Sequence, residues 1–444
     1  MTCFAQDLVH LYAELLVTAG RFAERKKGYG VKLLQDLPRN PRYSILLEPV
    51  WAIPGTIVLF YAPLYMKEAG LSDIEIGIIN SVNLYFAFIF QLFAGAVTNK
   101  LGRKRTTLIF DLLAWSVPMF IWAFSQNFWL FLIAYLLNAT SKFVTVSFNC
   151  LIIEDVEEHK RSKVFAILNM MITGAGVLTP IAGVVIADFG IGPTLASIYF
   201  AGGLLMTAMF LIRNRYTEET QVGKELMGLH NNTRVFRSLV ASLRLFGRSC
   251  YKRRLLPIIL ITVLSNLVLQ LNFFQVIYFK EQLSFDDRVI SFIPVVTAIT
   301  VMLLYLVIIP RLRRRSEEKY VSFSIVLSSV GAVLFLLIPS GNIAMLFLTL
   351  IVLAAGNFIL QTYRDSLLMN RLGTHEKADM FSAVQTVMTL TAIPSGYLTG
   401  LLYHYNPLWL FSVILGLYIV LMIIMLFLHD PKQHPQAINS YKNM

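Results

Sequence analysis

Long apolar runs recur along most of the chain, and they constrain its fold more than any other feature. An α-helix needs about 18 or more apolar residues to cross the hydrocarbon core of a bilayer. Here 56% of the 444 residues are hydrophobic and 14% are charged, whereas soluble domains carry about 25% charged residues. The sequence therefore predicts an all-α polytopic membrane protein.

Twelve of these runs are long enough to be transmembrane helices. The longest polar segment, 214–254, divides them six and six. The sequence thus predicts an N-terminal six-helix bundle over 44–213 and a C-terminal six-helix bundle over 255–430. The predicted spans are 44–66, 74–98, 105–125, 127–152, 163–187, 192–213, 255–279, 288–310, 319–338, 342–368, 378–402 and 407–428.

Besides the short loops, three longer segments lie outside the predicted spans. Segment 1–43 joins apolar residues at helical spacing to a basic stretch, which is typical of an amphipathic helix on the membrane surface; the alternative is an extension without a structural role. Segment 214–254 is predicted to be a cytoplasmic central loop with a second amphipathic helix. Segment 431–444 is predicted to be a tail. The first ten residues lack the basic and apolar regions of a cleavable signal peptide.

Basic residues are strongly biased to alternate loops. The even-numbered loops contain stretches such as NKLGRKR and RLRRRSEEK, while the odd-numbered loops are nearly free of Lys and Arg. Short cytoplasmic loops of membrane proteins are enriched in these residues. We therefore expect the even-numbered loops and both termini to be cytoplasmic, in an integral protein of the plasma membrane.

Several classes of protein are disfavoured. The net charge of +12 comes from short loops between apolar runs, which does not suit nucleic-acid binding. Cys3, Cys150 and Cys250 have neither disulfide-framework nor metal-site spacing. The chain contains no HExxH, GxSxG or GxxxxGK[ST] pattern, so the sequence predicts neither an enzyme nor an ATP-driven pump. We expect no cofactor, no metal and a monomer.

The two halves of the sequence resemble each other. YMKEAGLS returns as YFKEQLS at the end of the first span of each half, and CLIIEDVEEHKRSKVF returns as SLLMNRLGTHEKADMF. Parallel repeats of this kind imply an axis along the membrane normal and a binding site between the halves near the midplane. The matched segments are 65–72 with 278–284, 102–105 with 312–315, and 150–165 with 366–381.

The loop after the second span carries the pattern that identifies a family. It reads GAVTNKLGRK, with Gly95, Asn99, Lys100, Gly102, Arg103 and Lys104 at the key positions. With twelve spans, a 6+6 repeat and a basic central loop, the chain resembles the major facilitator superfamily, whose signature here is Gly-x-x-x-Asp-Arg/Lys-x-Gly-Arg-Arg/Lys. The resemblance implies two six-helix bundles related by a pseudo-two-fold axis.

Asn99 departs from the signature, because the family has Asp at this position. In the family, this Asp is thought to hold a charge-assisted contact between the halves that stabilises the outward-facing state. An amide accepts a weaker hydrogen bond than a carboxylate. The substitution predicts a looser inner gate.

By resemblance, the first, fourth, seventh and tenth spans line a central cavity. Polar residues in three of these spans recur at helical spacing, so each set is expected to share one helix face. We predict that most of them bind the substrate. The three sets are Asn138, Lys142, Thr145 and Asn149; Thr262, Asn266 and Gln270; and Asn357, Gln361, Arg364 and Asp365.

Charged residues in the spans allow more than one interpretation. Lys142 and Arg364 would give the cavity a positive potential that suits an anionic or polyhydroxylated solute. The structural alternatives are an ion pair for Lys142, and snorkelling or a local pair with Asp365 for Arg364. Glu48 and Asp111 are predicted proton-coupling sites, since carboxyl groups in a membrane cavity can carry protons. The alternative for Glu48 is an interfacial carboxylate.

The sequence favours a secondary active transporter that moves a small organic solute by alternating access, with protons as the coupling ion. Export is favoured by the fifth span, where Gly176, Pro180 and Gly183 match an exporter pattern although Thr179 replaces a glycine. One alternative is an uptake symporter for an anionic metabolite or sugar. Others are a non-transporting sensor, and a lipid flippase with a lateral opening between the halves.

Overall fold

The computed structural model describes residues 37–228, 255–308, 317–371 and 377–428. Within these ranges the secondary structure is helical and contains no strand. The predicted N-terminal amphipathic helix, the amphipathic stretch of the central loop and the C-terminal tail lie outside the described residues.

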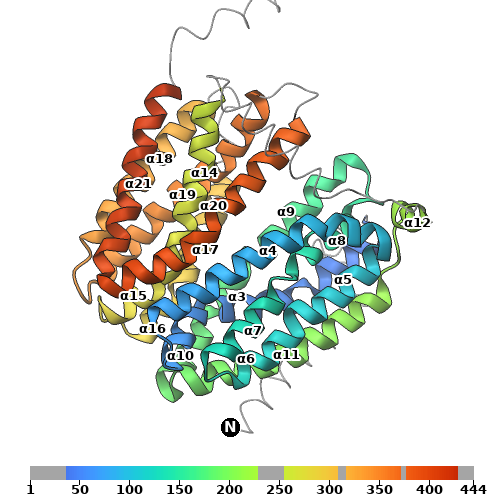
Figure 1. The fold of residues 1–444 in the computed structure, drawn as a ribbon, viewed down its shortest axis with the longest axis horizontal. Coiled ribbons are helices and arrows are strands. Elements are labelled where there is room, and N and C mark those ends of the chain that lie inside the picture. The colour runs from blue at the N-terminus through green and yellow to red at the C-terminus, as the bar shows by residue number, and fades with distance from the viewer. Residues whose placement is uncertain (1–36, 229–254, 309–316, 372–376, 429–444) are drawn as a thin grey trace, which may run out of the picture.

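The first half of the chain forms one bundle (Figure 1). Its first two spans are single long helices, whereas the third to fifth spans are each divided. Its elements are α3 (Arg39–Glu68), α4 (Asp73–Leu101), α5 (Arg103–Asp111), the π-helical turn η1 (Leu112–Ser116), α6 (Val117–Phe124), α7 (Phe128–Asn138), α8 (Ser141–Ile153), α9 (Glu158–Ala175), the 3₁₀ turn η2 (Gly176–Leu178), α10 (Thr179–Phe189), α11 (Ile191–Tyr216) and α12 (Gln221–Gly228).

The second half forms the other bundle (Figure 1). Eleven spans of the described chain are long and apolar enough to cross a bilayer, and α20 packs lengthwise among them as the twelfth. The elements are α14 (Leu256–Leu271), η3 (Asn272–Phe274), α15 (Gln275–Glu281), α16 (Asp287–Ser291), α17 (Ile293–Leu303), η4 (Leu304–Ile308), α18 (Glu317–Leu336), α19 (Ile343–Arg371), α20 (Lys377–Tyr405) and α21 (Pro407–Leu428).

Local sequence explains where several helices begin and end. Ser72 and Glu75 form a capping box at the start of α4, which satisfies backbone donors that a helix N-terminus leaves unpaired. Gly102 ends α4 with φ +85°, a conformation that favours glycine. A Cβ atom at Gly102 would also lie 2.5 Å from Glu219 Oε2. Gly102, the second glycine of the signature, is therefore needed for this turn.

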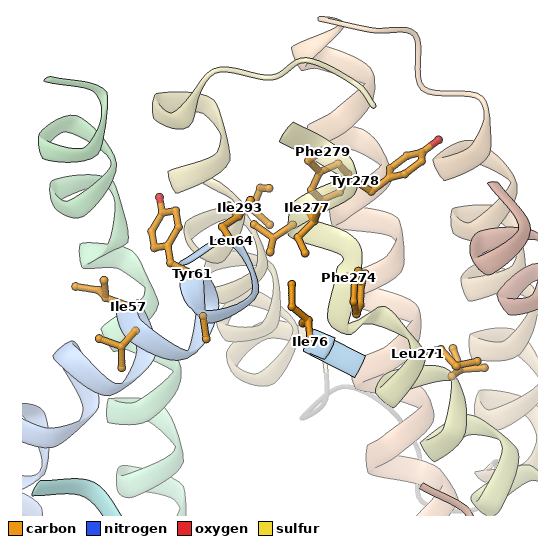
Figure 2. Packing of buried hydrophobic residues seen from close by; sticks show 14 of the residues in the cluster. Ile57, Tyr61, Leu64, Ile76, Leu271, Phe274, Ile277, Tyr278, Phe279 and Ile293 are labelled. Carbon is orange, nitrogen blue, oxygen red and sulfur yellow. The ribbon is translucent and has the colours of Figure 1, made fainter. Parts of the chain in front are cut away.

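The two bundles meet at one end, which we call the closed end. This end carries the α3–α4 turn (Glu68–Asp73) and the α15–α16 loop (Glu281–Asp287). Figure 1 shows the bundles converging at α10, α15 and α16 and diverging away from them. Figure 2 shows apolar side chains of the first half, such as Leu64, facing Ile277 and Ile293 of the second half. This apolar contact seals the closed end.

Small residues allow a close approach between the halves at α10 and α16. A Cβ atom built on Gly183 of α10 would lie 2.1 Å from Ser291 Cβ at the end of α16. Asp188, near the end of α10, pairs with Arg288 of α16 at 3.3 Å. The glycine that sequence analysis placed in an exporter pattern thus forms part of the contact between the halves.

We expect Gly183→Leu to prevent the closed end from closing, because the new side chain occupies the space of Ser291. The measurement is the yield of a short bifunctional thiol cross-linker between cysteines at Asp188 and Arg288, in a background without native cysteines. Gly174→Leu is the control, since a Cβ atom at Gly174 has nothing within 4 Å. Equal cross-linking in both variants would contradict this account.

Candidate functional site

A pocket of about 280 Å³ lies inside the first bundle, and we call it the carboxylate pocket. Five spans of the first half contribute to it, so its walls come from α3, the α5–η1 junction, α8, α9 and α11. The lining residues are Glu48, Trp51, Asp111, Trp115, Ser141, Val144, Thr145, Phe148, Asn149, Phe165, Leu168, Asn169, Ile172, Phe210 and Arg213.

A buried ion pair stands in the wall of this pocket. Arg213 Nη2 donates to Asp111 Oδ2, and the two residues are 5% and 2% exposed. The guanidinium carbon of Arg213 also lies 4.9 Å from the ring centroid of Phe148 and 5.3 Å from that of Phe210. Aromatic faces attract cations at such distances. Asp111 and the two rings therefore hold the guanidinium in place.

Glu48 is the second carboxylate of the pocket and lacks a comparable partner. Its side chain is 6% exposed, and its Oε2 atom has no hydrogen-bond partner among the described residues. Arg213 and Asp111 both lie within electrostatic reach of it. Two carboxylates thus share one guanidinium, and the lining carries a net negative charge whenever both are ionised.

Glu48 and Asp111 are among the residues predicted from the sequence, whereas Arg213 is not. An arginine in the last turn of a span is typical of any helix end at the cytoplasmic interface. Asp111 offered the one usable signal, because a buried acid inside a membrane requires a neutralising partner.

The π-helical turn η1 directly follows Asp111 and contributes Trp115 to the pocket. Such turns are frequent at functional sites.

A second pocket of about 300 Å³ lies between the halves, and we call it the seam pocket. It is largely apolar and is formed by α9 of the first half with α17, η4 and α19 of the second. Asn169 and Ile172 line both this pocket and the carboxylate pocket. The two pockets are therefore adjacent, and an apolar chamber between the halves borders a charged chamber within one half.

The predicted residues of the fourth span do not share one continuous helix. α7 ends at Asn138 and α8 begins at Ser141. Asn138 Nδ2 donates to the Ala114 carbonyl oxygen at 2.9 Å, so this side chain ties α7 to the third span. Thr145 and Asn149 line the carboxylate pocket.

Lys142 is half-buried on α8. Its ammonium group has no hydrogen bond or ion pair within the described part of the chain. Neither of the pockets described above includes Lys142 in its lining.

In the seventh span, the predicted residues have mixed roles. Thr262 is buried and its hydroxyl donates to the Ile258 carbonyl oxygen. Asn266 Nδ2 donates to the Met388 carbonyl oxygen at 3.3 Å, which joins α14 to α20. Gln270 is half-buried. None of the three residues lines the carboxylate pocket or the seam pocket.

In the tenth span, Asn357 lines a third pocket of about 160 Å³ inside the second bundle. Its Oδ1 atom accepts the hydroxyl of Tyr418 at 2.9 Å. Gln361 is exposed. Arg364 is 5% exposed and bonds Asp365 Oδ1 at 2.9 Å and Ser265 Oγ at 2.7 Å. The local pair with Asp365 neutralises the charge of this arginine.

The signature loop forms its hydrogen bonds with residues of the first half. Arg103 is buried and holds Glu154 through three hydrogen bonds of 2.9 to 3.0 Å. Glu219 accepts hydrogen bonds from the backbone N–H groups of Arg103 and Lys104 at the start of α5. A carboxylate is stabilising at a helix N-terminus.

The remaining signature residues differ in exposure. Gly95 and Lys100 are exposed, and Asn99 is half-buried. A Cβ atom at Gly95 would have nothing within 4 Å.

A family model described as the Major Facilitator Superfamily matches residues 52–396 and 258–442. The chain belongs to this superfamily. The fold of the chain is similar to the folds of solved transporters. The nucleoside transporter NupG, in a mutant form, is similar with a TM-score of 0.70 and 15% identity, over 87% of this chain and 99% of NupG. The POT family transporter PepTSo is similar with a TM-score of 0.66 and 11% identity, over 88% and 98%.

Two curated relatives of this superfamily member are similar over shorter stretches. The quinolone resistance protein NorA of Staphylococcus aureus (strain MRSA252) is 26% identical over 162 residues, which is 35% of this chain and 39% of NorA. The multidrug resistance protein MdtG of Citrobacter koseri is 26% identical over 171 residues, 37% of this chain and 41% of MdtG. The chain thus matches about two fifths of the length of these relatives.

We expect the two members of the buried ion pair to differ in their effect on stability. Arg213→Gln leaves Asp111 and Glu48 without a cation, and breaking a buried pair in this way costs about 3–5 kcal/mol. Asp111→Asn costs less, because Glu48 can still neutralise the guanidinium. Thermal unfolding of the purified variants in one detergent measures the order. A larger loss for Asp111→Asn would show that Glu48 does not interact with Arg213.

Proposed function

We propose that this protein exports a small amphipathic organic cation in exchange for protons, by alternating access. The Glu48 Oε2 atom in the carboxylate pocket, which has no hydrogen-bond partner within the described ranges, carries the proposal. A buried carboxylate is costly unless something neutralises it. A proton can do so, and so can the charge of a substrate, but not both at once. Because the proton and the substrate compete for the same carboxylate, binding of one releases the other.

The walls of the pockets support an amphipathic substrate. Aromatic rings of Trp51, Trp115 and Phe165 line the carboxylate pocket, and ring faces attract organic cations. The adjoining seam pocket, with its apolar lining, suits the uncharged part of the same molecule. A solute with a charged group and a bulky apolar group would use both chambers.

The basic loops indicate the orientation of the chain in the membrane. Lys and Arg gather at the end opposite to the closed end, and the positive-inside rule places that end in the cytoplasm. In this orientation the closed end faces outward, a conformation through which importers and exporters both pass. Export is supported by the names of the relatives NorA and MdtG, which denote resistance proteins.

A second candidate is the uptake of an anionic metabolite. Lys142 favours it, because its ammonium group has no partner among the described residues. Arg364 gives it little support, since Asp365 neutralises this arginine. The two candidates differ in the sign of the substrate charge. Ions of one shape and opposite charge, such as tetraphenylphosphonium and tetraphenylborate, therefore distinguish them.

We expect Glu48→Gln to make export of tetraphenylphosphonium independent of the pH gradient, because the variant has lost the group that exchanges protons for substrate. Under a gradient, transport by the variant should fall about tenfold or more, as expected when a contact to a charged group is lost. The measurement is tetraphenylphosphonium flux in proteoliposomes with and without a pH gradient.

Glu225→Gln is the matched control, since Glu225 is an exposed carboxylate on α12. It should retain both the rate and the gradient dependence. Retained pH coupling in Glu48→Gln would contradict the role of Glu48. Absence of any counterflow with the unmodified protein would instead favour a sensor, and movement of labelled lipid would favour a flippase.

We expect Lys142→Ala to fold normally and to keep tetraphenylphosphonium export, because a cationic substrate does not need this ammonium group. Flux in proteoliposomes and thermal unfolding of the same preparation measure the two properties. Loss of transport with normal unfolding, accompanied by tetraphenylborate binding to the unmodified protein alone, would support the anionic candidate and contradict the cationic one.

A further inference from the structure

Ser81 of α4 makes an unusual contact with α20 in the other half. Its hydroxyl donates to the Ile393 carbonyl oxygen at 2.8 Å and accepts from the Tyr397 backbone N–H at 2.7 Å. In a regular α-helix, a carbonyl group and the N–H four residues later bind each other. Ser81 therefore contacts both members of one helical hydrogen-bond pair of α20.

Pro394 lies inside α20, directly after Ile393. Proline has no backbone N–H, so the hydrogen bond that it removes is the one to the Leu390 carbonyl oxygen, and the Ile393–Tyr397 pair lies just beyond this interruption. A hydroxyl group both donates and accepts, which lets the single side chain of Ser81 serve both backbone groups.

The contact exists only because the two helices approach very closely. A Cβ atom on Gly396 would lie 2.6 Å from the Ser81 backbone nitrogen, and one on Gly77 would lie 2.7 Å from the Gly396 carbonyl oxygen. Gly400 is equally crowded, with the Asp73 carbonyl oxygen 2.4 Å from a built Cβ. The hydrogen bonds of Ser81 therefore depend on close contact between the halves.

We propose that Ser81 is a latch for the closed end of the transporter. When the halves separate at this end, Ser81 withdraws from α20 and both of its hydrogen bonds break. These two bonds therefore stabilise the closed conformation alone. The inference rests on alternating access, and it does not depend on the substrate or the coupling ion.

The test uses Ser81→Ala in the full chain. Spin labels on cysteines at Glu68 and Tyr405, both exposed and in different halves, report the separation of the closed end by pulsed electron paramagnetic resonance in nanodiscs. We expect the ratio of separated to closed molecules to rise about fivefold, the size expected for the net loss of one hydrogen bond. Hydrogen exchange of the Tyr397 amide should change in the same variant.

A control variant makes the test decisive. Ser395→Ala is the control, because the Ser395 hydroxyl donates to the Ala392 carbonyl oxygen within α20; it should leave the distance distribution unchanged. Unchanged distances in Ser81→Ala, or an equal shift in Ser395→Ala, would overturn the latch. A shift without tetraphenylphosphonium transport would leave the latch standing and reject only the proposed substrate.

Discussion

The requirement that a charge inside a membrane be neutralised governs the site of this protein. Asp111 and Arg213 meet the requirement by pairing with each other in the core of the first bundle. Glu48 lies close to both and has an oxygen without a hydrogen-bond partner among the described residues. When both carboxylates are ionised, the lining of the carboxylate pocket thus carries one negative charge more than Arg213 can balance, and that excess makes the pocket suitable for a proton or a cationic solute.

The fold connects this pocket with the contact between the halves. α9 lines the carboxylate pocket, and its continuation α10 packs against α16 at the closed end. The fifth span is interrupted by the 3₁₀ turn η2 between these two helices. Discontinuous helices of this kind are common at transporter sites. Occupancy of the pocket and closure of the far end therefore involve the same span.

Much of the architecture could be predicted from the sequence, because each span must supply about twenty apolar residues and the long loop divides them evenly. The motif around Gly102 was equally readable, since its backbone conformation requires glycine. The breaks at Ala139–Thr140 and Asn272–Phe274 could not be predicted, because neither contains proline or glycine. The roles of Arg213 and Ser81 could not be predicted either, because they depend on partners that are 102 and at least 312 residues away in the sequence.

Proton release on substrate binding tests the central claim most directly. Tetraphenylphosphonium is added to the purified protein in a weakly buffered solution with a pH indicator, without any membrane gradient. We predict that binding releases protons from the unmodified protein and releases none from Glu48→Gln. Binding without proton release, or equal release by both proteins, would contradict the claim that one carboxylate serves substrate and proton in turn.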